Sequence, residues 1–201
     1  MSRKVEQGRA TRRELVAIAT RLFATNGYDG TSVDDVLREA GISRGALYHH
    51  FAGKDALFEA VLGAVEAKVA ETLVEAARGV RDPVEVLRAG CAAWLRLAQD
   101  PTVRQIALVD APTAVGWRKW REIDERYALG LLKTTLRAAA ADGRLHRDSV
   151  DVLAHMLLAA LAEVALVVAR APDPAAAARA GKVAVDQLLD RLLAPKPRRT
   201  R

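Results

Sequence analysis

The sequence predicts an all-α fold of about nine helices, and three observations support this. Only 4% of the 201 residues are aromatic, and alanine is abundant. Apolar residues recur at three- and four-residue steps, without runs of alternating β-branched residues. Three Asp-Pro pairs are typical of helix starts, because aspartate caps free backbone N–H groups and proline tolerates the first helical position. The helices are expected at 9–26, 33–40, 44–50, 54–80, 83–99, 102–110, 115–141, 149–171 and 174–194.

The second and third helices are expected to form a helix-turn-helix motif. Thr31 can cap the second helix, with Asp34 at the capping-box position. Gly41 permits the left-handed backbone of a tight turn, and Ser43 can cap the third helix. The stretch therefore has the order of signals that a helix-turn-helix requires.

The third helix has one apolar side and one side of small and polar residues. At 100° per residue, Leu47 and Phe51 face inward, and the small Gly45 lies opposite them. Small outer residues would let this helix enter a DNA major groove. Arg44 has the donor fork that matches guanine, and Lys54, at the next helix start, could hold a phosphate. The candidate DNA-binding residues are Thr31, Ser32, Ser43, Arg44, Gly45, Ala46, Tyr48, His49, His50 and Lys54.

These residues carry a family resemblance. The stretch "TSVDDVLREAGISRGALYHHFAGKDALFEAV", preceded by "RELVAIATRLFATNGYDG", closely resembles the N-terminal domain of the TetR family of transcriptional regulators. Gly27-Tyr28, the turn at 41–43, and Tyr48, Phe51, Lys54 and Leu57 stand where that family's pattern expects them.

The resemblance implies a homodimer whose two recognition helices enter successive major grooves, each with a ligand-binding helical body behind it. We accordingly expect a DNA-binding domain with a basic N-terminal arm at 1–53, a helical ligand-binding and dimerisation domain at 54–195, and a disordered basic tail at 196–201. The implied function is a repressor that binds a pseudo-palindromic operator on double-stranded DNA and is released by a small-molecule effector. In that mechanism the ligand tilts the long fourth helix and spreads the recognition helices.

An effector site is expected from the distribution of aromatic residues. Trp117, Trp120 and Tyr127 fall along one face of a single expected helix, and Cys91 and Trp94 share a face of an earlier one. Such residues are also ordinary core, so a pocket for an apolar or aromatic molecule is a hypothesis. The candidate ligand-binding residues are Cys91, Trp94, Trp117, Trp120, Tyr127 and Met156.

The last two helices are expected to pair with their copies in a second subunit, because each is more apolar than a terminal helix needs for one core. Glu163 interrupts this surface and is interpreted as a paired polar group at the dimer contact, with a ligand anchor as the alternative. The candidate interface residues are Leu153, Leu157, Ala160, Glu163, Val164, Val167, Val185, Leu188, Leu189 and Leu192.

The charge and the cysteine content limit which other classes of protein the sequence could belong to. The net charge of +6 suits a polyanionic partner, and residues 1–13 alone carry five basic residues against one acid. A lone cysteine, Cys91, excludes an internal disulfide framework and a multi-cysteine zinc site. Nothing at the N-terminus resembles a signal peptide, so a cytoplasmic protein is expected. The apolar stretch from Val152 is interrupted by His155 and Glu163, which favours a helix buried against protein over a membrane span.

Two alternatives use the same residues differently. His49 and His50 point about 100° apart on a helix, so they do not match a helical metal pair at i, i+4 spacing. No acid-base set surrounds Cys91 in the sequence, and we predict no catalytic residue, metal or cofactor. A helical module that binds protein through the helix-turn-helix, or a small helical enzyme whose site forms only in three dimensions, remains open.

Overall fold

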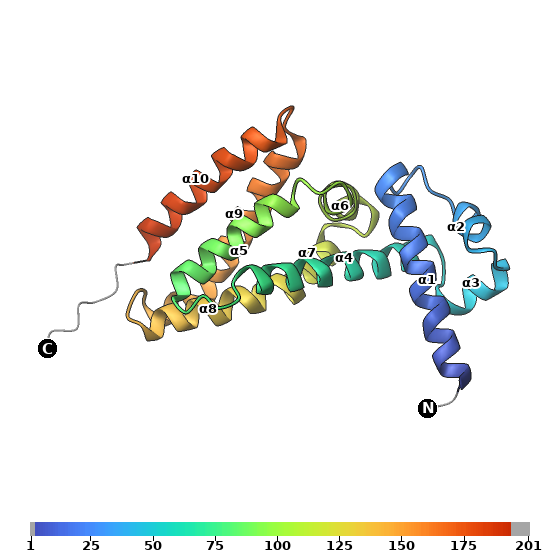
Figure 1. Cartoon of the computed structure of the whole chain (residues 1–201), viewed down its shortest axis with the longest axis horizontal. Coiled ribbons are helices and arrows are strands. Elements are labelled where there is room, and N and C mark those ends of the chain that lie inside the picture. The colour runs from blue at the N-terminus through green and yellow to red at the C-terminus, as the bar shows by residue number, and fades with distance from the viewer. Residues whose placement is uncertain (1–2, 194–201) are drawn as a thin grey trace, which may run out of the picture. The chain divides into compact units, whose positions relative to one another are not determined.

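The computed structural model describes residues 3–193, and within this range the chain is helical apart from its turns and loops, with no strand. The predicted all-α class is therefore confirmed (Figure 1). The chain divides into two compact units. The first holds the residues up to Glu66 together with Pro101–Trp120, and the second holds Ala67–Asp100 together with the residues from Arg121 onward.

The first unit begins with three helices: α1 (Arg3–Asn26), α2 (Val33–Ala40) and α3 (Arg44–His50). They are followed by the first part of α4 (Lys54–Ala76), which continues into the second unit. The π-helical segment η1 (Val103–Asp110), the short α6 (Ala111–Ala114) and the start of α7 (Trp117–Asp124) complete the unit.

The second unit is built around α5 (Pro83–Leu97), α8 (Gly130–Ala141), α9 (Val150–Arg170) and α10 (Pro174–Leu192). A second π-helical segment, η2 (Glu125–Leu129), precedes α8, and one 3-10 turn, η3 (Arg147–Ser149), precedes α9. Helices α5, α8 and α9 pack on one another, and α10 packs on α5 and α9.

Helix ends differ from expectation where the backbone offers a reason. Helix α1 includes residues 3–8, ahead of the expected start at residue 9, and this stretch contains no proline that would interrupt a helix. Helix α4 ends at Ala76 and not at residue 80, since the following turn contains Gly79 with a positive φ of 78°. Gly116, with a φ of 80°, likewise delays the start of α7 to Trp117.

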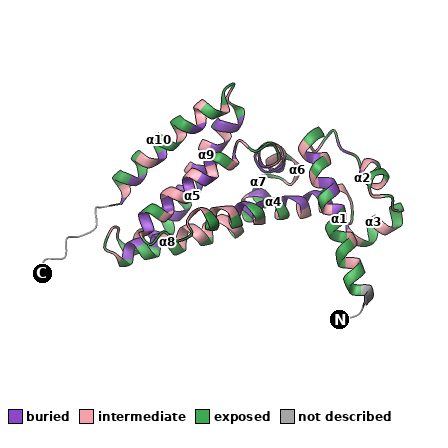
Figure 2. Ribbon diagram, viewed as in Figure 1, coloured by how far each residue is buried: buried purple, intermediate pink, exposed green. Residues whose placement is uncertain are grey.

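Three aromatic rings form the centre of the first unit. The rings of Phe23 and Phe58 meet edge to face, with centroids 5.0 Å apart, and Tyr28 meets Phe58 at the same distance. Phe23 and Phe58 are fully buried, as are Leu15 of α1 and Leu47 of α3. These side chains belong to the buried core of the first unit, purple in Figure 2, to which α1, α3 and α4 all contribute.

The second unit is held together by polar contacts as well as by its core. The guanidinium of Arg88 on α5 pairs with Asp186 at 3.3 Å and also with Asp190, both on α10. Arg144 pairs with Asp82, the N-cap of α5, at 2.5 Å. By length and composition alone, the stretch Arg147–Arg170 could cross a membrane, but core helices pass the same test and 44% of its most apolar window is buried inside the protein.

Candidate nucleic-acid interface

Helix α2 begins with a reciprocal capping arrangement. The Ser32 hydroxyl accepts a hydrogen bond from the Asp35 backbone N–H at 3.1 Å, and the Asp35 carboxylate accepts one from the Ser32 backbone N–H at 2.9 Å. The capping box is thus Ser32–Asp35, and the expected Thr31–Asp34 pair is wrong by one residue. Thr31 is 1% exposed and its hydroxyl donates to the Gly27 carbonyl at 2.9 Å, so its side chain holds the preceding turn.

The turn between α2 and α3 has the predicted conformation. Gly41 has a φ of 64° and donates its backbone N–H to the Leu37 carbonyl at 3.0 Å, which ends α2. Ser43 then caps α3, its hydroxyl accepting from the Ala46 backbone N–H at 3.3 Å. Both sequence predictions for this turn are confirmed, and the motif is a helix-turn-helix.

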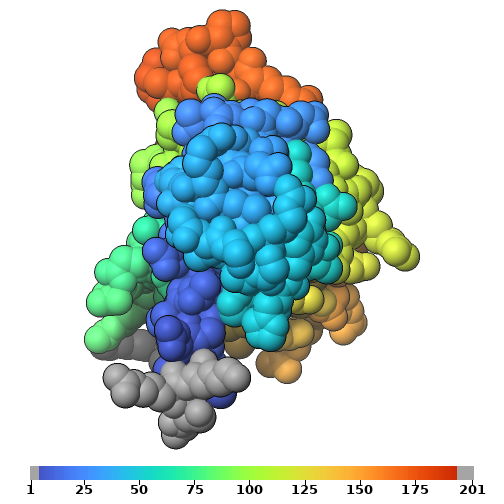
Figure 3. Space-filling view, turned by 90° about the vertical axis from the view of Figure 1, so that its right-hand side faces the viewer, coloured from blue at the N-terminus to red at the C-terminus, as the bar shows by residue number. Residues whose placement is uncertain are grey.

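Helix α3 presents one side to the core and the other to solvent. Leu47 and Phe51 are buried, as predicted. The exposed side chains, here called the recognition face, lie on the cyan part of the surface in Figure 3. Ala46 and His50 lie half-buried at its edges. The recognition face consists of Arg44, Gly45, Tyr48 and His49.

Two of the candidate basic residues have protein partners. The Arg44 guanidinium pairs with the Asp34 carboxylate of α2, and both side chains are exposed. The Lys54 ammonium lies 4.0 Å from the centroid of the Tyr28 ring, and the Tyr28 hydroxyl donates to Asp55. Burial, followed by the neighbouring Asp55, raises the pKa of Tyr28 to about 12, so the ring stays neutral beneath the ammonium.

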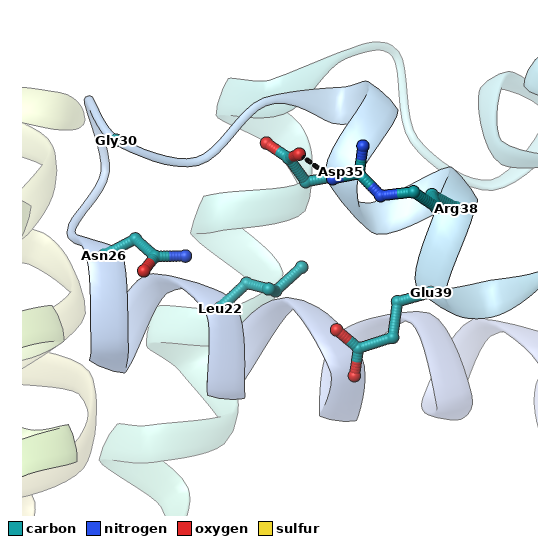
Figure 4. Close-up of a pocket in the computed structure, with 6 residues that line it drawn as sticks. All are labelled: Leu22, Asn26, Gly30, Asp35, Arg38 and Glu39. Carbon is teal, nitrogen blue, oxygen red and sulfur yellow. Dashed lines mark hydrogen bonds and ion pairs between the residues drawn. The ribbon is translucent and has the colours of Figure 1, made fainter.

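A shallow hollow opens between α1 and α2, lined by Leu22, Asn26, Gly30, Asp35, Arg38 and Glu39 (Figure 4). Two ion pairs border it: Arg38 with Asp35, and Arg21 with Glu39 at 2.5 Å. None of the candidate DNA-binding or ligand-binding residues lines this hollow. The three charged residues of its lining, Asp35, Arg38 and Glu39, are therefore already paired within the protein.

The candidate ligand-binding residues fall into both units. In the first, Trp120 is buried and donates its indole N–H to the Ala107 carbonyl at 3.0 Å, while Trp117 is 61% exposed. Their rings touch, with centroids 4.7 Å apart. In the second, Trp94 donates to the Leu161 carbonyl at 3.0 Å and Cys91 is buried, whereas Tyr127 is half-buried and Met156 is exposed. Burial raises the pKa of Cys91 to about 12, so its thiol stays protonated.

The candidate dimer residues divide by exposure. Leu157, Val185 and Leu189 are buried inside the second unit, which corrects the expectation that they face a partner. Leu153, Ala160, Val164 and Leu192 are half-buried. The exposed stripe of α9 runs through Val152, Met156, Ala159, Glu163 and Val167, of which Glu163 and Val167 were expected; the expected Leu188 of α10 is exposed as well. Helix α9 is apolar on nearly all sides, so spacing alone did not separate its exposed positions from its buried ones.

The sequence analysis did not identify two acidic residues, Asp110 and Asp124, that the structure places in special environments. Asp110 of η1 accepts from the Tyr28 backbone N–H at 2.8 Å and from the Gln105 amide at 3.0 Å, which ties η1 to the end of α1. Asp124 is buried in the second unit, and burial raises its pKa to about 6, although Arg121 at 3.5 Å acts in the opposite direction. Neither acid has a signal in its local sequence, since both environments arise from tertiary packing.

Within the part of the chain that the structure describes, no group of three or more histidine, cysteine or carboxylate side chains is arranged to hold a metal ion. The residues of the helix-turn-helix instead present a compact polar surface above a closed aromatic core.

Family models match two parts of the sequence. One, described as bacterial regulatory proteins of the tetR family, matches residues 15–61. The other, described as the tetracyclin repressor-like C-terminal domain, matches residues 84–192, more than half of the chain.

Individual relatives agree. The HTH-type transcriptional repressor AcnR of Corynebacterium jeikeium is 30% identical over 147 residues, 72% of this chain and 74% of that protein. The HTH-type transcriptional regulator AcrR of Shigella flexneri is 37% identical over 90 residues, a match that spans 44% of this chain and only 42% of its own length. The crystal structure of a TetR-family transcriptional regulator from Pectobacterium atrosepticum superposes with a TM-score of 0.84 at 30% identity, covering 98% of this chain and 100% of that one.

Proposed function

The chain belongs to the TetR family of DNA-binding transcriptional regulators, and we propose that it is a homodimeric repressor of a pseudo-palindromic operator, released by a small-molecule effector. Members of this family are regulators and not enzymes. The observation that carries the proposal is the recognition face of α3, exposed and polar outside while Leu47 and Phe51 anchor it inside. A protein that binds chromosomal DNA acts in the cytoplasm of a bacterium, which is where we place it.

The proposed DNA contacts are of two kinds: contacts to base edges, which read the sequence, and contacts to phosphates, which position the protein. Arg44 can donate two hydrogen bonds to a guanine, and Ala46 can meet a thymine methyl group. Gly45 faces open space, because a Cβ placed there would meet nothing within 4 Å, and its lack of a side chain would let the helix approach DNA closely. Thr31 fixes the turn before α2 without reaching DNA. The positioning residues that we assign to phosphate are Ser32, Ser43, Tyr48, His49, His50 and Lys54.

We propose that residues 1–53 bind DNA and that residues 54–195 bind the effector and the second subunit. Helix α4 begins at this boundary with Lys54, and it passes from the first compact unit into the second after Glu66. The proposed basic tail, 196–201, lies outside the described residues.

The proposed dimer contact uses the exposed residues of the last two helices. Val152, Met156 and Val167 on α9 and Val183 and Leu188 on α10, together called the apolar face, are large apolar side chains left in solvent. A second copy of the same face would cover them in a two-fold arrangement. Glu163 lies within the same stripe of α9, where a polar partner from the second subunit would satisfy it.

The effector is proposed to be a small apolar or aromatic molecule that binds near Trp94 and Tyr127 in the second unit. Trp94 links α5 to the Leu161 carbonyl of α9, so a ligand that moves either helix would disturb its indole. A broad panel of compounds should include one that changes tryptophan emission and raises the melting temperature. Emission and melting temperature that stay constant across the panel would contradict this part of the proposal.

The whole proposal is tested by selecting bound sequences from a random double-stranded DNA pool at two salt concentrations. We expect an enriched palindrome in which the centres of the two half-sites are separated by about 10 base pairs, which is one helical turn, or by a multiple of this distance. Binding should weaken steeply with salt because phosphate contacts release counterions. Weak, salt-insensitive binding with no enriched sequence would favour a protein-binding module instead.

A further inference from the structure

The first turns of α1 carry more positive charge than a helix start favours. Residues 3–13 include five basic residues and one acid, Glu6, and this whole range belongs to α1. The positive end of the helix dipole lies at this terminus, so cations there reduce helix stability. Arg9 and Arg13 are also spaced i, i+4, where like charges repel by a few tenths of a kcal/mol. The basic residues of these turns therefore lower the stability of the helix that contains them.

Contacts place these turns beside the end of α3. A Cβ built on Gly8 would lie 3.9 Å from the His50 ring, which is ordinary van der Waals contact. The guanidinium of Arg12 lies 4.8 Å from the centroid of the Phe51 ring, and this cation–π contact fixes α1 to the residue that ends α3. In Figure 3 the dark blue part of α1 accordingly lies next to the cyan surface of α3.

Arg9 and Arg13 follow these two contact positions by one residue each. They point about 100° around α1 from the side that touches His50 and Phe51, and both are exposed. No acid within residues 3–193 forms an ion pair with either guanidinium, whereas Arg21, farther along the same helix, pairs with Glu39. Arg9 and Arg13 are thus two cations without an ion-pair partner in the described residues, on a helix that lies beside the end of α3.

We propose that Arg9 and Arg13 form a second DNA-binding site, which holds backbone phosphates outside the base pairs read by α3. This inference rests on the proposed operator binding and extends it to the flanking duplex. Guanidinium groups bind phosphate oxygens through paired hydrogen bonds, and phosphates repeat along any duplex regardless of sequence. The site therefore adds affinity and lengthens the protected DNA without adding base specificity.

The test combines a protein change with a change in DNA length. One duplex carries only the palindrome enriched by selection, and a second carries the same palindrome with about ten extra base pairs, one helical turn, on each side. The proteins are the wild type, Arg9→Gln with Arg13→Gln, and a control with Arg104→Gln and Arg118→Gln. Both control arginines are exposed in the same unit and form no ion pair within the described residues, so the control removes the same charge.

The wild type and the control should bind the extended duplex with about tenfold higher affinity, or more, than the short duplex. The Arg9/Arg13 variant should bind the two duplexes with equal affinity. Its slope of log affinity against log salt should fall by about 3 to 4 for a dimer, from two phosphates in each half. Its melting temperature should stay equal or rise, because like-charge repulsion is removed.

A variant that keeps the wild-type preference for the extended duplex would overturn the inference, as would an equal loss of that preference in the control. These results differ from failure of the proposed function, in which the wild type itself would enrich no palindrome.

Discussion

The recognition face of α3 and the apolar face of α9 and α10 are both exposed, yet they are chemically opposite. The first consists of an arginine, a glycine, a tyrosine and a histidine. The second presents valine, leucine and methionine side chains, with Val167 58% exposed and Leu188 38% exposed. The recognition face can bind a charged polymer such as DNA, which offers phosphates and polar base edges. The apolar face is costly to expose to water, and only contact with another apolar surface offsets that cost. Exposure alone therefore does not indicate a partner, but exposure combined with chemistry does.

The largest expected effect comes from placing charge on the apolar face. Val167→Glu with Leu188→Glu should raise the dimer dissociation constant by roughly 100-fold or more, because unpaired buried charges cost about 3–5 kcal/mol. Sedimentation velocity would measure this. Val74→Glu with Val109→Glu is the control, since both valines are exposed elsewhere. Equal dimerisation of the two double variants would contradict the assignment of this face.

A second effect separates the interior of the second unit from its surface. The pKa of Asp124 is raised by burial, so folding favours its protonated form, and its contribution to stability is present at low pH and lost as pH rises through about 6. Asp124→Asn should raise the free energy of unfolding at pH 7.5 by up to about 3 kcal/mol, and by much less at pH 4.5. Urea denaturation at both pH values would measure the difference. A gain that is independent of pH would contradict the role of burial.

On the recognition face, Arg44→Ala should remove about 1–3 kcal/mol of discrimination at one base pair in each half-site. Competition binding with single-base operator variants measures this quantity. Arg38→Ala is the matched control, because Arg38 is an exposed arginine of α2 paired with Asp35. Equal loss of affinity for every operator variant would show that Arg44 positions the protein and does not read sequence.

Lys54→Ala should have a smaller and uniform effect. We expect all operator variants to weaken alike, by about 1 kcal/mol, and the salt slope to fall by about 1 per protomer. Removing the ammonium also exposes the Tyr28 ring, so a melting curve should accompany the titration. A selective loss at one base pair would place Lys54 among the reading residues.

The smallest expected effect concerns the pair between Asp34 and Arg44. Exposed ion pairs contribute about 0–1 kcal/mol, so Asp34→Asn should raise operator affinity severalfold at most by freeing the guanidinium. Glu39→Gln removes the same charge from α2 but releases Arg21. If both variants raise affinity equally, the change reflects net charge and not the release of Arg44.

The contrast between the two faces also marks what the sequence could predict. Gly41, Ser43, Leu47 and Phe51 were placed correctly because each depends on local geometry: a left-handed turn, a cap and a helical repeat. The capping box was misplaced by one residue because Thr31–Asp34 and Ser32–Asp35 match the same spacing. The structure distinguishes them, because Thr31 is buried and donates to Gly27 while Ser32 and Asp35 make the two capping hydrogen bonds.

Long-range features were beyond such reasoning. The bond from Tyr28 to Asp110 joins positions 82 residues apart and has no local signal. The aromatic residues of 117–127 were expected on one regular helical face, but Trp117 is exposed, Trp120 is buried, and π-helical η2 changes the rotation before Tyr127. In α9, an apolar surface on nearly every side left its outer stripe undefined.

The most direct measurement of the central claim is a parallel selection from random double-stranded DNA with the wild type and Gly45→Glu. A Cβ at Gly45 meets nothing within 4 Å, so the variant should fold with a melting temperature close to that of the wild type. Its carboxylate would stand at the centre of the recognition face, facing phosphates and base edges. We predict an enriched palindrome for the wild type and none for the variant. Enrichment of the same palindrome by both proteins would show that α3 does not enter the DNA groove.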